Sequence, residues 1–401
     1  MKTLKQHIRK LNKEQFNQLR NYCFHSNSLY NCALYVVKEF YKETNKYIGF
    51  NKLYHELKTN YHYKQLPSKV AQQTLRLVEK NFKSFFHLLK LKLKGKYSQK
   101  VKEPQYHKKH DLFILILPSD QVSLRKNLLK ITKNIKIPFT YPIEGKVKSC
   151  IIKPYGNNYF TIHISYEENK KELFKLNKDN YLSIDLGINN FVSSFSTVGH
   201  SFIMNGKPLK AYNQFYNKQK SKIQSELKTK NNKNWSNKLN ILTINRSNWI
   251  NNYFNQTVAF IIKRCLEYNI GSIVCGYNET WKQESNIGRI NNRNFNSIPF
   301  YLFKQKLESK CKEYGINFIL QEESYTSKCS FLDEEILEHK EIYLGSRVKR
   351  GLFKTSKNLL VNADVQAAAN ILKKVVPNFK LNNGIKASIV KPLMLKHCFN
   401  L

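Results

Sequence analysis

Two aspartates stand at the ends of apolar segments, where carboxylates can do metal chemistry. Asp185 lies near the end of the apolar segment YLSIDLGI, and Asp364 lies near the start of NADVQAAANIL, which reads as a helix. Carboxylate oxygens are the ligands that Mg²⁺ prefers. Two such ions about 4 Å apart can activate water and stabilise the leaving oxygen in phosphodiester hydrolysis. An isolated aspartate at such a place is ordinarily a helix cap or a surface residue. Whether these two are catalytic therefore depends on the order of the elements around them.

The elements from residue 180 onward follow an order that explains both aspartates. Three short strands are predicted in residues 180–205, and long helical sequence follows Pro208. The remaining elements are predicted from the apolar periodicity: a strand at 271–278, a helix at 299–314, a strand at 316–323 and a helix at 362–375. This order, with an insert before the last helix, predicts a ribonuclease H-like α/β fold. In that fold one aspartate projects from the first strand and another from the start of the last helix, which are the places of Asp185 and Asp364.

The first 175 residues have a different pattern. Apolar spacing predicts helices over 10–43 and 68–94, the second with Ser68 as its N-cap. Shorter alternating segments over 111–170 predict a small β-barrel or sheet module. Between them, residues 90–109 form a strongly basic linker in which phosphate contact is expected. The candidate contacts are Lys92, Lys94, Lys96, Lys100, Lys102, Lys108 and Lys109.

Charge and composition restrict the class of partner. The chain has 401 residues with 68 Lys and Arg against 28 Asp and Glu, a formal net charge of +40. A folded protein with this charge repels itself unless a polyanion neutralises it, and nucleic acid is the expected partner. No apolar run is long enough to span a bilayer, and the N-terminus has no secretory signal pattern. The eight cysteines are scattered without a CxxC pair, so we expect no disulfide framework.

Several segments together resemble one family. YLSIDLGINNFVSSFS is similar to the first RuvC motif, and VNADVQAAANILKK to the third, of the TnpB (OrfB) proteins of bacterial insertion sequences. Other segments resemble that family in the same order: SNSLYN, LPSKVAQQTLRLVEKNFKSFF, KEPQYHKK, WKQESNIGRINNRNFNSIPFYLFKQKL, ESYTSKCSFLD and GSRVKRGLF. The resemblance therefore covers nearly the whole chain.

The resemblance implies a transposon-encoded, RNA-guided DNA endonuclease, related to the type V CRISPR effectors. Such a protein binds a guide RNA from the transposon end and recognises a short motif beside its DNA target. It cuts the target with a RuvC nuclease domain that uses two Mg²⁺ ions, or Mn²⁺. No membrane and no small-molecule substrate are expected, and the implied location is the bacterial cytoplasm, with nucleoid association.

The sequence departs from the family pattern at two places. The strand GSIVCGYN should end in glutamate, but Gly276 stands there. The family's zinc ribbon supplies two CxxC pairs, whereas the insert at about 325–356 keeps only Cys329. We therefore expect no zinc, because a ribbon without three of its thiolates has no useful affinity. We expect the insert to be held by packing of its apolar residues: Phe331, Leu332, Ile342, Tyr343 and Leu352.

A relocated glutamate is predicted to replace the missing acid. The candidates are Glu279, in a polar loop, and the pair Glu322 and Glu323 at the end of the strand 316–323. Neighbouring parallel strands lie about 4.8 Å apart, so a carboxylate on the next strand can still reach the metals. Adjacent strand residues face opposite sides, so one of the pair should point at the site. We choose Glu323, with Glu322 in reserve, and some TnpB proteins and eukaryotic relatives resemble this chain in such a relocation.

The predicted domains are a helical recognition domain with an N-terminal wedge strand at 1–95, a β-barrel or wedge module at 96–175, and a RuvC domain at 176–401. Two other functions remain open. One is a guided DNA-binding repressor that no longer cuts, which the loss of the strand-end glutamate suggests and the two retained aspartates oppose. The other is a DNA-strand-joining transposase using the same metal chemistry in recombination.

Overall fold

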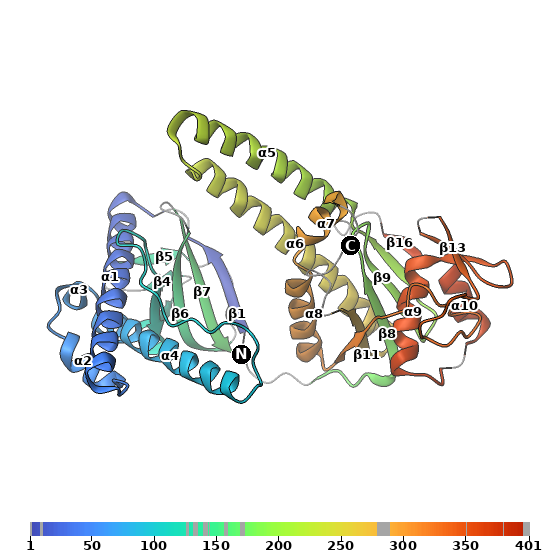
Figure 1. The fold of residues 1–401 in the computed structure, drawn as a ribbon, viewed down its shortest axis with the longest axis horizontal. Coiled ribbons are helices and arrows are strands. Elements are labelled where there is room, and N and C mark those ends of the chain that lie inside the picture. Colours follow the sequence, from blue (N-terminus) through green and yellow to red (C-terminus); the bar gives the residue numbers. More distant parts are fainter. Residues whose placement is uncertain are drawn as a thin grey trace. The chain divides into compact units, whose positions relative to one another are not determined.

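The computed structural model describes the chain except for residues 1, 9–10, 126–127, 131–134, 139–142, 144, 156–158, 169–172, 279–288, 350, 380 and 396–401. The chain forms two compact units, Met1–Lys171 and Glu172–Leu401, each with its own core (Figure 1). Within the described ranges, every helix is too short or too polar to cross a lipid bilayer.

Four helices build one side of the first unit: α1 (Lys13–Thr44), α2 (Phe50–Leu57), α3 (Tyr61–Lys64) and α4 (Ser68–Leu93). A capping box starts α1: the Asn12 side chain accepts from the Gln15 backbone amide, and the Gln15 side chain accepts from the Asn12 backbone amide. Asn45 ends the helix in the left-handed conformation that asparagine tolerates. The expected cap of α4 was wrong by one residue. Pro67 is the N-cap there and Ser68 is already helical, which leaves the first turn without a side-chain cap.

The strands of the first unit form two sheets. The larger has the order β1-β7-β6-β2, and the smaller has the order β3-β4-β5. Their bounds are β1 (Lys2–His7), β2 (Leu115–Pro118), β3 (Ser123–Arg125), β4 (Leu128–Lys130), β5 (Lys136–Pro138), β6 (Lys146–Tyr155) and β7 (Tyr159–Glu167), with a 3-10 turn at Ser119–Gln121. The N-terminal strand pairs antiparallel with β7. Helices and strands share one hydrophobic core, because residues from α1, α4, β6 and β7 belong to the same buried cluster.

The basic linker packs along α1. The Asn31 side chain donates to the His107 carbonyl at 2.9 Å and accepts from the His107 amide at 2.9 Å. The His107 ring stacks on Tyr30 with centroids 4.4 Å apart, and Lys38 pairs with Glu103 at 2.8 Å. These contacts fix the backbone of residues 103–108, while the lysines of the linker remain exposed.

A six-stranded mixed sheet forms the centre of the second unit, in the order β12-β11-β8-β9-β10-β16. The strands are β8 (Asn177–Leu186), β9 (Asn190–Ser196), β10 (Phe202–Asn205), β11 (Ile270–Tyr277), β12 (Asn317–Glu322) and β16 (Leu393–Leu395). β11 runs parallel to both β8 and β12, and β9 runs antiparallel to β8. The element order contains the one predicted from the sequence, to which the structure adds a helix at Arg289–Asn296, three short strands in and after the insert, the edge strand β16 and the helix before it.

The helices of this unit are α5 (Lys207–Asn231), α6 (Asn237–Glu267), α7 (Arg289–Asn296), α8 (Phe300–Tyr314), α9 (Ala363–Val375) and α10 (Asn383–Val390). α6 and α8 lie on one face of the sheet, and α9 and α10 lie on the other. Leu182 and Ile184 of β8 belong to the buried cluster that contains α6 and α8. The opposite face packs against α9 and α10, through residues such as Val274 and Phe195 (Figure 1). Side chains alternate between the two faces of a strand, so Asp185 belongs to the face covered by α9.

The insert contains three short antiparallel strands, β13 (Ser346–Lys349), β14 (Leu352–Lys354) and β15 (Leu360–Asn362). Phe331 packs into the core as expected, together with Phe353. The expectation for Ile342 was wrong, since its side chain is 88% exposed. Glu335, which the sequence did not single out, is buried there. The insert is therefore organised partly by a buried polar group rather than by apolar packing alone.

Candidate active site

Asp185 is positioned by the central strand β8, one residue before its end. Its neighbours Ile184 and Leu186 are buried on the other face, which anchors the strand. Burial raises the pKa of the Asp185 carboxyl well above its usual value, and the negative charges of Glu323 and Asp364 raise it further. The Arg347 guanidinium and the Leu186 amide act in the opposite direction on this pKa. Asp185 therefore lies at the centre of a group of three acids and one arginine.

Glu323 reaches this group because Gly276 has no side chain. A Cβ built on Gly276 would lie 2.7 Å from Glu323 Oε2 and 2.7 Å from Ile371 Cδ1. Both distances are shorter than real carbon contacts, so a larger residue at 276 would displace the carboxylate. The Glu323 carboxylate therefore lies over the end of β11.

The neighbouring glutamate points elsewhere. Glu322 is paired in register with Tyr277, and its carboxylate accepts from Lys374 Nζ at 2.9 Å and from the Ser324 amide at 2.6 Å. These hydrogen bonds and the Lys374 charge lower the pKa of Glu322 despite its partial desolvation. Glu279, the third candidate, lies outside the described residues. Of the two glutamates at the end of β12, Glu323 is the one whose charge acts on Asp185.

Asp364 enters the group from the first turn of α9. Asn362 is the N-cap of this helix, and its side chain accepts from the amides of Asp364 and Val365. One carboxylate oxygen of Asp364 accepts from Asn190 Nδ2 at 2.7 Å, and the other accepts from Arg347 Nη2 at 3.0 Å. Its side chain keeps 27% of its exposure, and that of Arg347 keeps 47%. Asp364 is thus held from two sides, by the start of β9 and by the insert strand β13.

Sequence reasoning missed Asn190 and Arg347. Arg347 lies within the segment GSRVKRGLF that resembles the family, but nothing in its type or spacing separates it from the other cations of the chain. Asn190 belongs to an asparagine-rich turn, where a local backbone bond is the ordinary expectation. Only the fold, which brings the start of β9 and the insert to the start of α9, identifies them.

The donor set suits a hard divalent cation. Burial, followed by the charges of Glu323 and Asp364, raises the pKa of Asp185, and a divalent cation bound by these oxygens would offset both effects. Within the part of the chain that the structure describes, no three His, Cys, Asp or Glu side chains are already arranged as a metal-binding group. The Arg347 guanidinium occupies one side of Asp364 instead. Asp185, Glu323 and Asp364 are the residues that would hold a metal here.

The insert is fixed to α9, the helix that carries Asp364. Asn370 Nδ2 donates to the carbonyls of Cys329 and Thr326, at 2.7 and 2.9 Å. Lys373 Nζ donates to the Glu335 carbonyl at 3.0 Å. The Cys329 thiol donates to the Ile336 carbonyl at 3.4 Å. The insert strand that carries Arg347 is therefore tied to the same helix as the acid it contacts.

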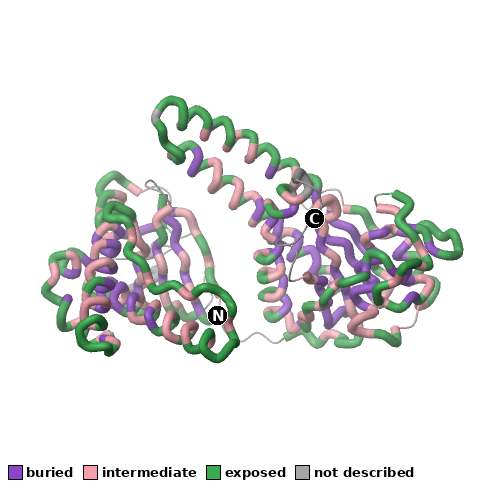
Figure 2. Tube along the Cα trace, viewed as in Figure 1, coloured by how far each residue is buried: buried purple, intermediate pink, exposed green. Residues whose placement is uncertain are grey.

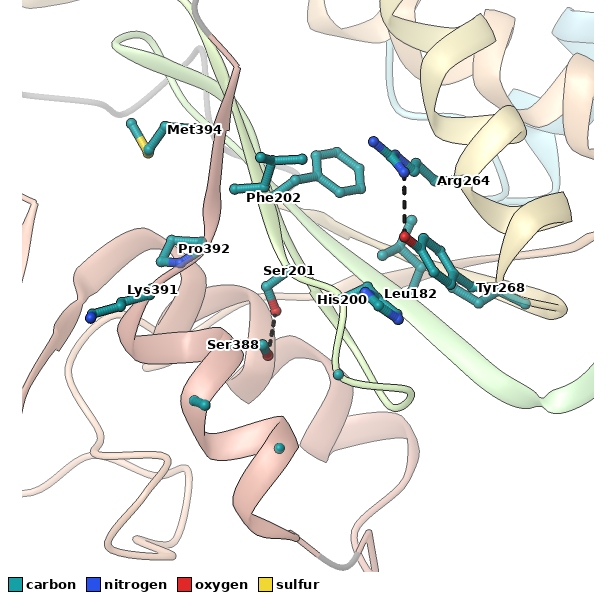
Figure 3. Close-up of a pocket in the computed structure, with 15 residues that line it drawn as sticks. Leu182, His200, Ser201, Phe202, Arg264, Tyr268, Ser388, Lys391, Pro392 and Met394 are labelled. Carbon is teal, nitrogen blue, oxygen red and sulfur yellow. Dashed lines mark hydrogen bonds between the residues drawn. The ribbon is translucent and has the colours of Figure 1, made fainter.

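A cavity of about 750 Å³ lies at the other end of the sheet (Figure 3). Ile270, the first residue of β11, and His200, in the turn before β10, line it. The His200 ring stacks on Tyr268 with centroids 3.6 Å apart, and Arg264 donates to the Tyr268 hydroxyl at 3.4 Å. Arg264 also pairs with Glu267 at 2.9 Å. Asp185 lies at the opposite end of β8, so this cavity is separate from the acids.

The seven candidate phosphate-binding lysines of the linker all belong to the first unit and are exposed: Lys92, Lys94, Lys96, Lys100, Lys102, Lys108 and Lys109. Lys92 lies on the last turn of α4, and Lys108 directly follows the His107 contact with α1. Their exposure is compatible with phosphate contact, which stays a prediction.

Comparisons with known proteins agree with this arrangement. A family model described as a probable transposase, OrfB_IS605, matches residues 163–282, and the Cas12f1-like TNB domain matches residues 300–371. The TnpB-like protein ORF457 of Acidianus two-tailed virus is 26% identical over 356 residues, which cover 78% of this chain and 74% of that protein. The structure of a Cas12f1–sgRNA–target DNA complex has a similar fold, with a TM-score of 0.57 and 15% identity over 90% of this chain and 83% of that one. In its matched domains and its relative, this chain is therefore similar to the TnpB (OrfB) family.

Proposed function

We propose that the protein is a transposon-encoded, RNA-guided DNA endonuclease of the RuvC type that cuts beside a short flanking motif. The observation that carries this proposal is the convergence of Asp185, Glu323 and Asp364 at one end of the central sheet. Similarity to the TnpB (OrfB) family and a net charge of +40 support nucleic acid as the partner. The fold shared with a Cas12f1 that was solved with sgRNA and target DNA supports a guide RNA and a DNA target.

Each residue of the site has a distinct task in this proposal. Asp185, Glu323 and Asp364 hold the metals, and Asn190 orients the Asp364 carboxylate. Two bound Mg²⁺ ions, or Mn²⁺, would supply the activated water and the charge that stabilises the leaving oxygen. The Arg347 guanidinium, which now contacts Asp364, is the cationic group beside the acids that could also contact a phosphate oxygen.

The test is an incubation of the full chain, purified with the RNA that it carries from its own genomic context, with target DNA and Mg²⁺. A double-strand cut that is lost in Asp185→Asn supports the endonuclease. Binding without a cut would favour the guided repressor, and joined strands would favour the transposase. Protein that carries no discrete RNA would contradict RNA guidance, whatever the acids do.

A further inference from the structure

The helices α5 and α6 form a long antiparallel hairpin that extends beyond the central sheet (Figure 1). The contact between them is narrow. On α5 it uses four buried residues, Leu209, Asn213, Tyr216 and Ile223. Arg246 of α6 donates to Asn213 at 2.7 Å and lies over the Tyr216 ring. Most of the remaining surface of α5 is exposed (Figure 2).

The outer face of α5 carries a row of cations. The helix has seven lysines and one acidic residue, Glu226. At about 100° per residue, five of these lysines fall within an arc of about 120° that lies opposite the four buried residues. We call these five residues the α5 stripe: Lys207, Lys210, Lys218, Lys222 and Lys228. The arrangement places like charges three or four residues apart, which is unfavourable for an isolated helix.

Other helices of the same unit neutralise their lysines. On α8, Lys312 pairs with Glu308 at 2.6 Å and Lys310 pairs with Glu313 at 2.8 Å. On α6, Lys263 lies 4.0 Å from Glu267. In the described ranges of the chain, no residue of the α5 stripe makes an ion pair. Among the described residues, no carboxylate therefore neutralises the charge of the stripe, which leaves it available to an anionic partner.

The stripe has the length and chemistry of a surface that binds a nucleic-acid backbone. From Lys207 to Lys228 it extends about 32 Å at 1.5 Å per residue. Hydroxyl groups lie among the lysines on the same arc, from Ser221, Ser225 and Thr229. A-form duplexes display phosphates and 2′-hydroxyls across a wide, shallow minor groove, where ammonium and hydroxyl side chains can reach both. B-form DNA has no 2′-hydroxyl and a narrower minor groove.

We propose that the α5 stripe binds the backbone of an A-form duplex that contains RNA, namely the paired guide and target. The proposal rests on the proposed function for the identity of that duplex. It adds the surface on which the duplex lies, and it makes the contact independent of base sequence because lysine and hydroxyl groups reach phosphate and sugar.

The experiment compares two variants of the full chain with equal net charge. The stripe variant is Lys218→Gln, Lys222→Gln and Lys228→Gln, and the control is Lys263→Gln, Lys310→Gln and Lys312→Gln, whose lysines are already neutralised by glutamates. Glutamine has a helix propensity close to that of lysine, and circular dichroism checks folding. The probes are an RNA–DNA hybrid of about 20 base pairs and a DNA duplex of the same sequence. Binding is titrated without divalent metal over a range of salt concentrations.

For the hybrid, log K falls as log salt rises, and the stripe variant should reduce the magnitude of this negative slope by about 2 to 3. The control should keep the wild-type slope. The DNA duplex should show a smaller change. Equal slopes in the stripe variant and the control would overturn the proposal, and so would an equal or larger change on the DNA duplex. Because binding is measured without cutting, an inactive nuclease would leave this result readable, and an active nuclease with an unchanged slope would overturn the stripe alone.

Discussion

The Glu323 carboxylate lies over Gly276, with Oε2 2.7 Å from where a Cβ of that glycine would be. The missing side chain on β11 and the extra acid after β12 are thus one feature. If Glu323 is the third metal ligand, Glu323→Gln should abolish cleavage while nucleic-acid binding stays close to wild type, because one charge in a surface of +40 contributes little to binding. Glu322→Gln, whose partner is Lys374, is the matched control and should cut normally.

The two positions should also be exchangeable in a double variant. Gly276→Glu alone should be inactive or unstable, because the new side chain meets both Glu323 and Ile371. Combined with Glu323→Ala, it should recover part of the cleavage, since the carboxylate then approaches the same place from β11. Cleavage is measured with single-turnover DNA cutting at saturating Mg²⁺. No recovery in a double variant that remains folded would mean that Glu323 acts in another way.

Asn190 offers a graded test of the site. Its amide holds one oxygen of Asp364 at 2.7 Å. Partners of metal ligands typically contribute about 10- to 100-fold in metal affinity or activity, so Asn190→Ala should raise the Mg²⁺ concentration at half-maximal cutting within that range. Asp364→Ala and Asp185→Ala should abolish cutting outright and leave RNA and DNA binding nearly intact. A wild-type rate in either aspartate variant would refute the nuclease assignment.

Removing the Arg347 charge should strengthen Mg²⁺ binding and lower the maximal rate of cutting. The Arg347 guanidinium lies 3.0 Å from Asp364, where it would compete with a bound cation. Arg347→Gln should therefore lower the Mg²⁺ concentration needed for half-maximal cutting, while the maximal rate falls because a phosphate contact is lost. Arg347→Lys should keep the charge and lose the forked geometry. If both quantities stayed at wild-type values in Arg347→Gln, Arg347 would have no part in the reaction.

The elements of the second unit could be predicted because their hydrophobic periods are regular and their ends are marked. Asp185 and Asp364 followed from element order, since each lies where a buried strand ends or a capped helix begins. Strand alternation indicated that only one of Glu322 and Glu323 faces the site, and Glu323 was chosen because it directly precedes the turn; its charge raises the pKa of Asp185, while its role as a ligand stays a prediction.

What could not be predicted depends on contacts between distant segments. Arg347 and Asp364 are 17 residues apart and meet only because β13 folds back beside the start of α9. The burial of Glu335 and the exposure of Ile342 could not be predicted either, because a charged side chain is ordinarily exposed and an apolar one is ordinarily buried. Extended segments such as 103–108 also read as solvated linker, although asparagine side chains of α1 bind their backbone.

His163, which lies among cations on the larger sheet of the first unit, should make the stability of that unit depend on pH. Burial lowers the pKa of His163 to about 4, and the charges of Lys153, Lys5 and His7 contribute. In the unfolded chain the His163 ring binds a proton near pH 6.5, whereas in the folded chain it binds one only near pH 4. The free energy of unfolding of this unit should therefore fall as pH drops through that window, and the fall should be smaller in His163→Gln.

The measurement is an NMR titration of the histidine rings together with urea unfolding at both ends of the window. His87→Gln, on the exposed side of α4, is the control and should leave the pH dependence of the first unit unchanged. A polyanion on this sheet face would add negative charge, so bound nucleic acid should raise the pKa of His163. A His163 signal that titrates near pH 6.5 in the free protein would contradict the lowering of its pKa by burial and by the neighbouring cations.

Glu335 should hold the insert in the role that a metal has in a ribbon. Its side chain is fully buried, and its two oxygens accept from the amides of Ser330 at 2.7 Å and Leu344 at 3.0 Å. Leu344 lies three residues before Arg347, so this carboxylate fixes the approach to β13. In Glu335→Gln one of the two amides loses its acceptor, which costs about 1 to 3 kcal/mol for a buried donor. We expect a lower unfolding temperature, faster proteolysis within 336–345 and slower DNA cutting with nucleic-acid binding retained.

The control is Glu341→Gln, at an exposed position of the same insert, which should change none of these. Elemental analysis should find well under one zinc per chain, and a zinc chelator should leave the unfolding temperature of the wild type unchanged. A stoichiometric zinc signal that disappears in Cys329→Ser would show that a metal, and not Glu335, closes the insert.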